Sequence, residues 1–544
     1  MSIFSYNYDD FLRNSPSSLG YLPQSKRHKS VAIIGGGICG IVAAYELLRS
    51  GMQSVTIFEA CKERLGGRCY SQKFIESHPC YIAELGAMRF SRNQVCLFHY
   101  LEKFNISTNQ MFPNPGVVDT EIHYQGNAYS WKKGEAPPLM FEKLYIGWTA
   151  FLRQGVKIGG VFLAGPEVMR NLSQQRKHDA LEKEWKKYID IFSSVSFYNA
   201  LVMIFTNDTP PGGEKWSIPE DFDLFGLLGI GTGGMFSVYQ VSFIEILCII
   251  VSGFEVDQLL INGGISSLVE CIADQSFNGI CLRERVCYQK VVAIDRSSES
   301  NIVLILENGI KESYDRVIIT VTPRAMQVGL KGDKRKLFNS SVITAINQSH
   351  MISSSKIFIL CQEKFWKKYG LPQTIQSDQL VKAVYCLDYL PEDDSSYGVV
   401  LLNYTWEEDS YKFLSVKDKV RRFKTLVDDL AIVAPYFSKY LRPVNDDYER
   451  YIICYDWLMD EYSLGAFKLQ YPGRDHYTEE LFFQFKTANF PEKDKGIYLA
   501  GCSCSFHGGW IEGAIITALN SVCSVIRSCG GSLVSGNPLD NLYL

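Results

Sequence analysis

The sequence has no apolar run long enough to cross a bilayer. Its best candidate, residues 243–254, is interrupted by Glu245. It is about a dozen residues long, whereas a spanning helix needs roughly 20. We therefore expect a buried helix there and no membrane association. The first 28 residues contain no apolar segment after a basic start, so the sequence predicts no signal peptide and favours a cytoplasmic protein.

An excess of charge of either sign is also missing. The formal net charge is −4, which gives no basic surplus of the kind that binds nucleic acid or anionic lipid. The sixteen cysteines are scattered, and the close pair Cys502 and Cys504 lacks the CxxC spacing of zinc and redox motifs. We expect reduced thiols and no metal site.

What is present is the composition of a large folded protein. Hydrophobic residues make up 46% of the chain, and 544 residues are too many for one compact core. The sequence therefore predicts two or more domains.

The clearest local pattern lies in residues 30–59. Residues 30–34 (SVAII) are apolar and rich in β-branched side chains, which predicts a buried parallel strand. Residues 41–49 have helical spacing and stop before Gly51. Residues 54–59 (SVTIFE) predict a second strand, so the three segments form a βαβ unit.

The loop inside this unit, GGGICG, fits the G-x-G-x-x-G pattern. Gly35 permits a tight turn, Gly37 lets the backbone approach a pyrophosphate, and Gly40 allows close packing of helix on strand. Glu59 lies 19 residues beyond Gly40, where a carboxylate accepts hydrogen bonds from ribose hydroxyls. The unit predicts a dinucleotide site, and the alternative is a glycine turn that binds nothing.

A second glycine pair just past Glu59 favours FAD over NAD. The segment Arg64-Leu65-Gly66-Gly67-Arg68 suits a cofactor whose second half lies along the domain. Arg64 and Arg68 would meet phosphate or the isoalloxazine side, or else be solvated.

The rest of the chain alternates between helical and β-rich stretches. Helical patterns dominate residues 140–260, as in residues 180–191, and β-like patterns fill residues 283–321. Strands are predicted at residues 399–404 and 496–500, and a glycine-rich turn then leads into an apolar helix. The cluster GIGTGG at residues 229–234 has no strand before it, which favours a turn near a pocket.

The chain thus opens and closes with strand–glycine–helix units. We predict an α/β fold in which α+β insertions interrupt a discontinuous Rossmann-type FAD-binding domain, and a substrate domain combines a mixed sheet with a helical part. The predicted segments are an irregular N-terminal arm (1–28), three FAD-binding parts (29–110, 265–330, 488–530), two substrate-domain parts (111–264, 331–487) and a tail (531–544).

These motifs resemble those of the flavin amine oxidase family. The likeness is carried by residues 35–40, Glu59 and Gly66-Gly67-Arg68, and AELGAMRF at residues 83–90 is similar to its amino-acid-oxidising branch. It continues to LAGCSCSFHGGWIEGA near the C-terminus. The resemblance implies non-covalently bound FAD, O2 as co-substrate and a possible homodimer.

The resemblance also assigns roles at the reacting centre. Arg89 corresponds to the arginine that pairs with the substrate carboxylate, and its alternative is a structural ion pair. Lys356 in SSSKIF corresponds to the lysine near flavin N5, which acts through a bound water; the alternative is an exposed strand lysine. Trp457 corresponds to an aromatic wall of the substrate pocket, or else to ordinary core packing.

Further residues follow from the same likeness. In lysine-active relatives an acidic residue follows the central GTGG turn, whereas Phe236 and Val238 are apolar here, which favours an aromatic substrate over a cationic one. The resemblance implies that this substrate is L-tryptophan. Trp510 and Ile511 lie where backbone N–H groups face the flavin, and Trp510 also borders the substrate. The remaining cofactor positions are Cys39, Met88, Gly501 and Val286, whose backbone would meet adenine. Cys39 stands where the family often has serine.

The implied reaction is the oxidative decarboxylation of L-tryptophan with O2 to indole-3-acetamide. One alternative is an L-amino-acid oxidase of aromatic or apolar range that gives keto acid, ammonia and H2O2. Another is a non-catalytic flavoprotein that binds partners through its central insertion.

Overall fold

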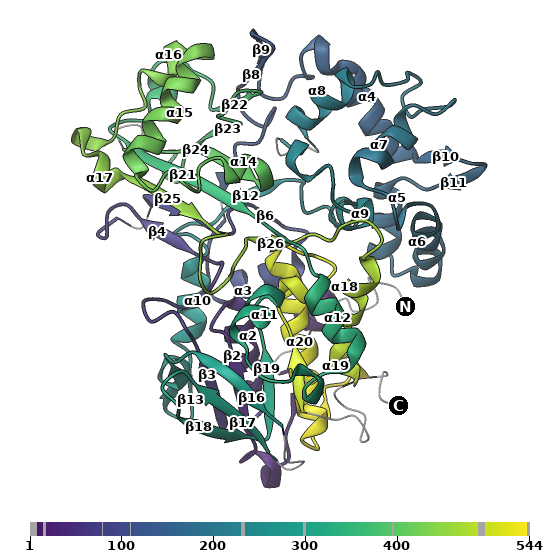
Figure 1. Cartoon of the computed structure of the whole chain (residues 1–544), viewed down its shortest axis with the longest axis vertical. Helices are drawn as coiled ribbons and strands as arrows, with labels where there is room; N and C mark the ends of the chain where they lie inside the picture. The colour runs from purple at the N-terminus through teal and green to yellow at the C-terminus, as the bar shows by residue number, and fades with distance from the viewer. Residues whose placement is uncertain are drawn as a thin grey trace.

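The computed structural model describes residues 8–14, 18–78, 80–108, 110–229, 234–296, 301–393, 396–487 and 496–540. Figure 1 shows a lower half built around a parallel sheet and an upper half in which a larger sheet lies beside a group of helices. Within the described stretches, every helix is too short or too polar to span a membrane.

A parallel five-stranded sheet forms the centre of the lower half. Its order is β15-β3-β2-β19-β27, and all four pairings are parallel. The strands are β2 (Ser30–Ile34), β3 (Ser54–Phe58), β15 (Val286–Cys287), β19 (Arg316–Ile319) and β27 (Ile497–Leu499). They come from three separate stretches of chain, which confirms the predicted discontinuous α/β fold.

Both faces of this sheet are covered, which explains its uninterrupted apolar strands. Val31 and Ile33 pack into a core shared with α2 (Ile38–Arg49) and α20 (Ile511–Ser528), which lie side by side in Figure 1. Ala32 and Ile34 face the opposite core. That core contains the antiparallel strands β16 (Val291–Asp295), β17 (Ile302–Leu306) and β18 (Lys311–Tyr314). The helix α2 begins three residues before the predicted position 41.

The upper half contains a mixed seven-stranded sheet of order β25-β21-β24-β23-β22-β8-β9. Only the β22–β8 pairing is parallel. The strands are β8 (Thr120–Tyr124), β9 (Asn127–Trp131), β21 (Ser354–Cys361), β22 (Thr374–Ser377), β23 (Ala383–Leu387), β24 (Gly398–Trp406) and β25 (Ile452–Asp456). The helix α15 (Lys419–Val433) shares a core with one face. The predicted strand at residues 399–404 lies within β24.

Six helices form a separate part of the upper half, called here the helical part. They are α4 (Leu139–Gln154), α5 (Pro166–Gln174), α6 (His178–Phe192), α7 (Phe197–Phe205), α8 (Glu220–Leu228) and α9 (Phe243–Ser252). The predicted helix at residues 180–191 is confirmed as part of α6. The helix α9 is buried along residues 243–251 and is capped by Gly253, so the prediction of a buried helix there is also confirmed.

The prediction of an irregular N-terminal arm is wrong for the residues described. They form α1 (Asp9–Asn14) and β1 (Gly20–Tyr21), and β1 pairs with β28 (Ser532–Leu533). Tyr8 donates a hydrogen bond to Asn520 of α20 over 2.7 Å. A six-residue helix has little stability of its own, and tertiary packing supplies what local sequence does not show.

The domain boundaries given above stay a prediction. The turn predicted at residues 229–234 lies mostly outside the described residues.

Candidate active site

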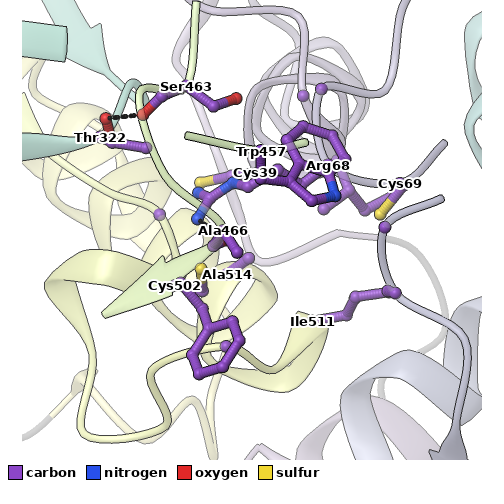
Figure 2. A pocket seen from close by; sticks show the side chains of 18 of the residues that line it. Cys39, Arg68, Cys69, Thr322, Trp457, Ser463, Ala466, Cys502, Ile511 and Ala514 are labelled. Atoms are coloured by element: carbon purple, nitrogen blue, oxygen red, sulfur yellow. Dashed lines mark hydrogen bonds between the residues drawn. The ribbon is translucent and has the colours of Figure 1, made fainter. Parts of the chain in front are cut away.

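A cavity of about 370 Å³, called here the inner cavity, opens at the carboxyl ends of the parallel strands and reaches the mixed sheet. Ligands bind at this edge in open parallel sheets. Of the predicted site residues, the following line it: Gly35, Gly37, Cys39, Glu59, Gly67, Arg68, Met88, Arg89, Val238, Lys356, Trp457, Gly501, Trp510 and Ile511. Figure 2 shows part of the lining of the inner cavity, including Cys39, Arg68, Trp457, Cys502 and Ile511.

The first glycine loop follows β2 at the floor of this cavity. Gly35 has a φ of 110°, which only glycine adopts readily, and its N–H donates to Phe58 O over 2.8 Å. A Cβ added to Gly37 would find its nearest atoms, Gly66 O and Gly67 Cα, at 3.8 and 4.0 Å. A Cβ on Gly40 would instead strike Gly35 O. Gly37 therefore leaves space beside the cavity, whereas Gly40 allows close packing.

The helix that follows this loop presents a free N-terminus. Its N-cap is Gly37, and no side chain caps it. The first N–H groups of a helix lack partners within the helix and carry a partial positive charge. Together with the open space at Gly37, this end of α2 suits a pyrophosphate.

Glu59 is fixed where β3 ends. Its Oε2 accepts from Gly36 N over 2.7 Å and its Oε1 accepts from Cys61 N over 2.8 Å. Burial raises the pKa of Glu59, although both backbone donors oppose the shift. The carboxyl group is thus held rigidly at the cavity wall, in reach of a ligand's hydroxyls.

The second glycine pair is joined to the first, because Gly66 N donates to Gly36 O over 2.8 Å. Arg68 lines the cavity and donates from Nη1 to Ala466 O over 2.9 Å. Arg64 does not line it. Its Nη1 donates to Gly67 O over 2.6 Å and its guanidinium lies 3.8 Å from the Tyr70 ring centroid. Arg64 therefore supports the loop from outside.

Gly40 and Val286 also lie outside the cavity lining. Val286 pairs with Ile57 at the edge of the parallel sheet. Gln289 and Lys290 line the cavity in its place, so this short stretch reaches the cavity a few residues later than the resemblance implied.

Arg89 lies in a box of aromatic rings. Its guanidinium carbon is 4.9 Å from the ring centroid of Phe112, 5.5 Å from that of Tyr385 and 5.6 Å from that of Tyr404. Ring faces stabilise a cation that lies within about 6 Å of the ring centroid. A half-buried guanidinium held in this way suits a bidentate contact with the carboxylate of a ligand.

Lys356 is buried on β21 with 1% of its surface exposed, which rules out an exposed strand lysine. Its Nζ donates to Glu84 O over 2.9 Å and to Gly86 O over 2.6 Å, and lies 4.7 Å from the Tyr404 ring centroid. Burial lowers the pKa of Lys356 to about 7. The carboxylate of Glu84 opposes this shift, and the charge of Arg89 adds to it.

Trp457 closes the cavity beside the same segment. Its Nε1 donates to Leu85 O over 2.7 Å, and only 2% of the residue is exposed. A Cβ on Gly86 would lie 3.3 Å from its Cζ2. The segment at residues 84–89 therefore carries Arg89 and accepts hydrogen bonds from both Lys356 and Trp457.

Trp510 is the N-cap of α20, where no side chain caps the helix. Its ring centroid is 5.2 Å from that of Phe254, which lies two residues after the end of α9. Glu512, in the first turn of α20, does not cap its own helix. Its carboxylate accepts hydrogen bonds from the N–H groups of Cys96 and Leu97 at the start of α3 (Val95–Lys103). A second helix N-terminus is thus open at the inner cavity.

Several residues that line the inner cavity were not predicted from the sequence. Tyr404 and Trp406 lie two positions apart on β24, and Tyr404 is paired in register with Lys356. Thr322 and Ser463 also line the cavity, joined by a 2.9 Å hydrogen bond from Thr322 Oγ1 to Ser463 O (Figure 2). In LLNYTW (residues 401–406), large apolar side chains recur at every second position, as on one face of a strand. This alternation was the one local signal for Tyr404 and Trp406.

A second cavity of about 340 Å³, called here the outer cavity, adjoins the inner one. Arg89, Tyr404 and Trp406 line both. Phe236, which is 59% exposed, lines the outer cavity, whereas Val238 lines the inner one. The two residues predicted together as a substrate wall therefore lie on different cavities.

Known proteins resemble the chain over nearly its whole length. Residues 38–526 match the family described as flavin containing amine oxidoreductase. The chain is 50% identical over 538 residues to a tryptophan 2-monooxygenase of Pseudomonas savastanoi, covering 98% of this chain and 96% of that protein. It is 48% identical over 545 residues to a tryptophan 2-monooxygenase of Pantoea agglomerans pv. gypsophilae, covering 99% and 96%.

A solved structure shares the fold. Wild-type putrescine oxidase bound to putrescine aligns with a TM-score of 0.64 at 18% identity, covering 92% of this chain and 99% of that chain. At this identity the likeness concerns the fold alone.

Proposed function

Because the chain belongs to the family of flavin-containing amine oxidoreductases, we propose that it converts L-tryptophan and O2 to indole-3-acetamide, CO2 and water. The observation that carries the proposal is that Arg89 and Lys356 line one cavity with aromatic walls. The identity of about half the residues with two tryptophan 2-monooxygenases supports the choice of substrate.

The cofactor in this proposal is FAD, held without a covalent bond. The two linked glycine loops, the open N-termini of α2 and α20, and Glu59 offer backbone donors and a ribose acceptor that fit its pyrophosphate and sugar. Bound flavin supplies the acceptor for two electrons from the substrate and, once reduced, reacts with O2.

The chain's own residues would orient the amino acid. Arg89 fixes the carboxylate by two parallel hydrogen bonds, and the aromatic side chain lies among Trp457, Val238 and Trp406. Anchoring the carboxylate while packing the aromatic side chain fixes the position of Cα and excludes water. Most of the rate enhancement would come from this orientation and from the dry site.

Lys356 would handle a proton at this centre. With a pKa of about 7, its Nζ is partly neutral near physiological pH. Two carbonyl oxygens hold Nζ in place, so it is positioned to hold a water or to exchange a proton beside the substrate amine.

Anaerobic mixing of the yellow holoenzyme with a panel of amino acids tests this proposal. We expect tryptophan to bleach the flavin fastest and cationic amino acids to bleach it least. Equal bleaching by many apolar amino acids would favour a broad oxidase. No bleaching by any amino acid would favour a non-catalytic flavoprotein.

The proposal includes a homodimer, as the family resemblance suggests. Leu139 and Ile146 of α4, and Phe162 of the neighbouring strand β11 (Val161–Leu163), are 83%, 47% and 56% exposed, so apolar surface is present for a contact between copies. Sedimentation of the holoenzyme is expected to give twice the 61.7 kDa chain mass, and a monomer would contradict the dimer.

A further inference from the structure

The outer cavity carries charges that the proposed chemistry does not use. It lies between α8, the short helix η2 (Phe236–Val238) and the edge formed by β22, β23 and β24. Its ionisable lining residues besides tyrosines are Arg89, Asp223, Asp378, Lys382 and Asp409. Both signs of charge therefore face one hollow next to the residue that receives the substrate carboxylate.

Two of these acids are already engaged. Asp378 accepts from Gln125 N and from Gln379 Nε2, both over 2.7 Å. Asp409 accepts from Ser237 Oγ over 2.8 Å and from Lys412 Nζ over 2.5 Å. Donors from the protein already occupy both carboxylates, so neither is the natural partner of a ligand.

Asp223 is different. Among the described residues, its carboxylate has no hydrogen-bond or ion-pair partner, although it is only half-exposed. Burial and the nearby charge of Glu220 raise the pKa of Asp223. A carboxylate in this position gains most from a cation that enters the cavity.

Lys382 is the matching positive charge. Within the described residues, the acceptor in reach of its Nζ is Asp378 O, at a long 3.3 Å. Burial acts to raise the pKa of Asp409, but the hydrogen bond from Lys412 and the charge of Lys382 outweigh it. The ammonium group of Lys382 thus keeps donors for an anionic ligand.

The remaining wall is apolar and aromatic. Leu227, Phe236, Tyr385 and Trp406 line the same cavity, and its volume of about 340 Å³ falls in the range of small-ligand pockets. A ligand that carries one positive charge, one negative charge and a large aromatic group matches all three features of this lining.

We propose that the outer cavity is a second binding site for the zwitterionic amino acid, occupied before it reaches the inner cavity. Lys382 holds the carboxylate, Asp223 holds the ammonium group, and Phe236 contacts the aromatic side chain. Arg89 and Trp406 line both cavities, so the carboxylate passes from Lys382 to Arg89. The inference rests on the proposed function, because it takes tryptophan as the ligand.

Anaerobic stopped-flow mixing of the FAD-loaded enzyme with tryptophan tests the site. Charges at a binding rim chiefly change association rates, so Lys382→Met is expected to lower the association rate constant about five-fold. The limiting rate constant of flavin reduction at saturation stays unchanged. Lys382→Arg restores association, and Lys424→Met, at an exposed lysine outside the cavity, has no effect.

Testing two variants against two ligands distinguishes the role of Asp223 from that of Lys382. Indole-3-propionate carries the carboxylate without the amine, and its binding is followed by the change in flavin absorbance. Asp223→Asn is expected to slow association of tryptophan and not of indole-3-propionate, whereas Lys382→Met slows both. Asp190→Asn, an exposed acid on α6, is the matched control.

Unchanged association in Lys382→Met, or an equal loss in Lys424→Met, would overturn the proposal. A failure of the proposed function looks different, because the wild-type enzyme itself would then not be reduced by tryptophan.

Discussion

At the scale of single residues, Arg89 is our proposed anchor for the substrate carboxylate. Arg89→Ala removes the charged partner of the carboxylate, a loss that typically costs about 2–5 kcal/mol, so the dissociation constant for tryptophan should rise at least about thirty-fold. Bound FAD should remain. Anaerobic titration measures this constant, and Arg92→Ala, at an exposed arginine three residues away, is the control. An unchanged constant in Arg89→Ala would remove it from the site.

The protonation of Lys356 predicts a pH profile. Because its pKa is about 7, Nζ is an ammonium below that pH and a neutral amine above it. If the neutral amine exchanges the proton, the rate constant of flavin reduction rises with pH and levels off above about 7. Lys356→Met should lose this rise and be slower by about a hundred-fold.

The pH profile of Lys356→Met is needed as a control, because Glu84 is a second group that titrates near the same pH. Burial raises its pKa to about 7 as well, and Lys356 opposes that shift. A rise near pH 7 that persists in Lys356→Met would therefore belong to Glu84 and would contradict the role given to Lys356.

The sequence predicted Arg89, Lys356 and Trp457 as site residues because each lies in a short motif that resembles a family pattern, and all three line the inner cavity. It did not identify Tyr404 or Trp406, because their place depends on the pairing of β24 with β21. Register across strands is set by non-local packing, which no local pattern contains.

At the scale of elements, two glycines at the start of α2 are expected to serve different purposes: Gly37 serves FAD binding, and Gly40 serves folding. Gly37→Ala adds a Cβ where the protein leaves space, at a φ of −69° that alanine tolerates. The apoprotein should melt at the wild-type temperature, while FAD affinity falls about ten-fold, since disturbed charge-assisted hydrogen bonds cost about 1.5–3 kcal/mol.

Gly40→Ala should instead lower the melting temperature of the apoprotein more than it lowers the affinity for FAD. Its Cβ would strike Gly35 O, and such overpacking typically costs about 1–3 kcal/mol of the free energy of unfolding. Thermal melting of both apoproteins, with FAD titration by fluorescence, makes the comparison. A folded Gly37→Ala protein with wild-type FAD affinity would contradict a pyrophosphate at this loop.

The βαβ unit could be predicted because its signal is local. The apolar run of β2, the glycine loop and the helical spacing of α2 all lie within 20 residues of chain, from Ser30 to Arg49. The helix α1 could not be predicted, because Phe11 and Leu12 gain their stability from packing on distant elements.

At the scale of the whole molecule, two sheets from interleaved stretches of chain meet at one cavity. The opening and closing strand–glycine–helix units predicted that the first sheet is discontinuous. The second sheet joins β8 to β22 in parallel although Thr120 and Thr374 are far apart in the chain. Such long-range pairings explain why its strand order was beyond reach of the sequence.

We propose that L-tryptophan and O2 give indole-3-acetamide, CO2 and water, which requires oxidation and decarboxylation of the same bound amino acid. Turnover of L-tryptophan under ¹⁸O2, followed by mass spectrometry and oxygen uptake, tests it most directly. We predict one indole-3-acetamide per O2 consumed, with one ¹⁸O atom in its amide group and no H2O2. Indole-3-pyruvate and H2O2 in place of the amide, or an unlabelled amide, would contradict the account.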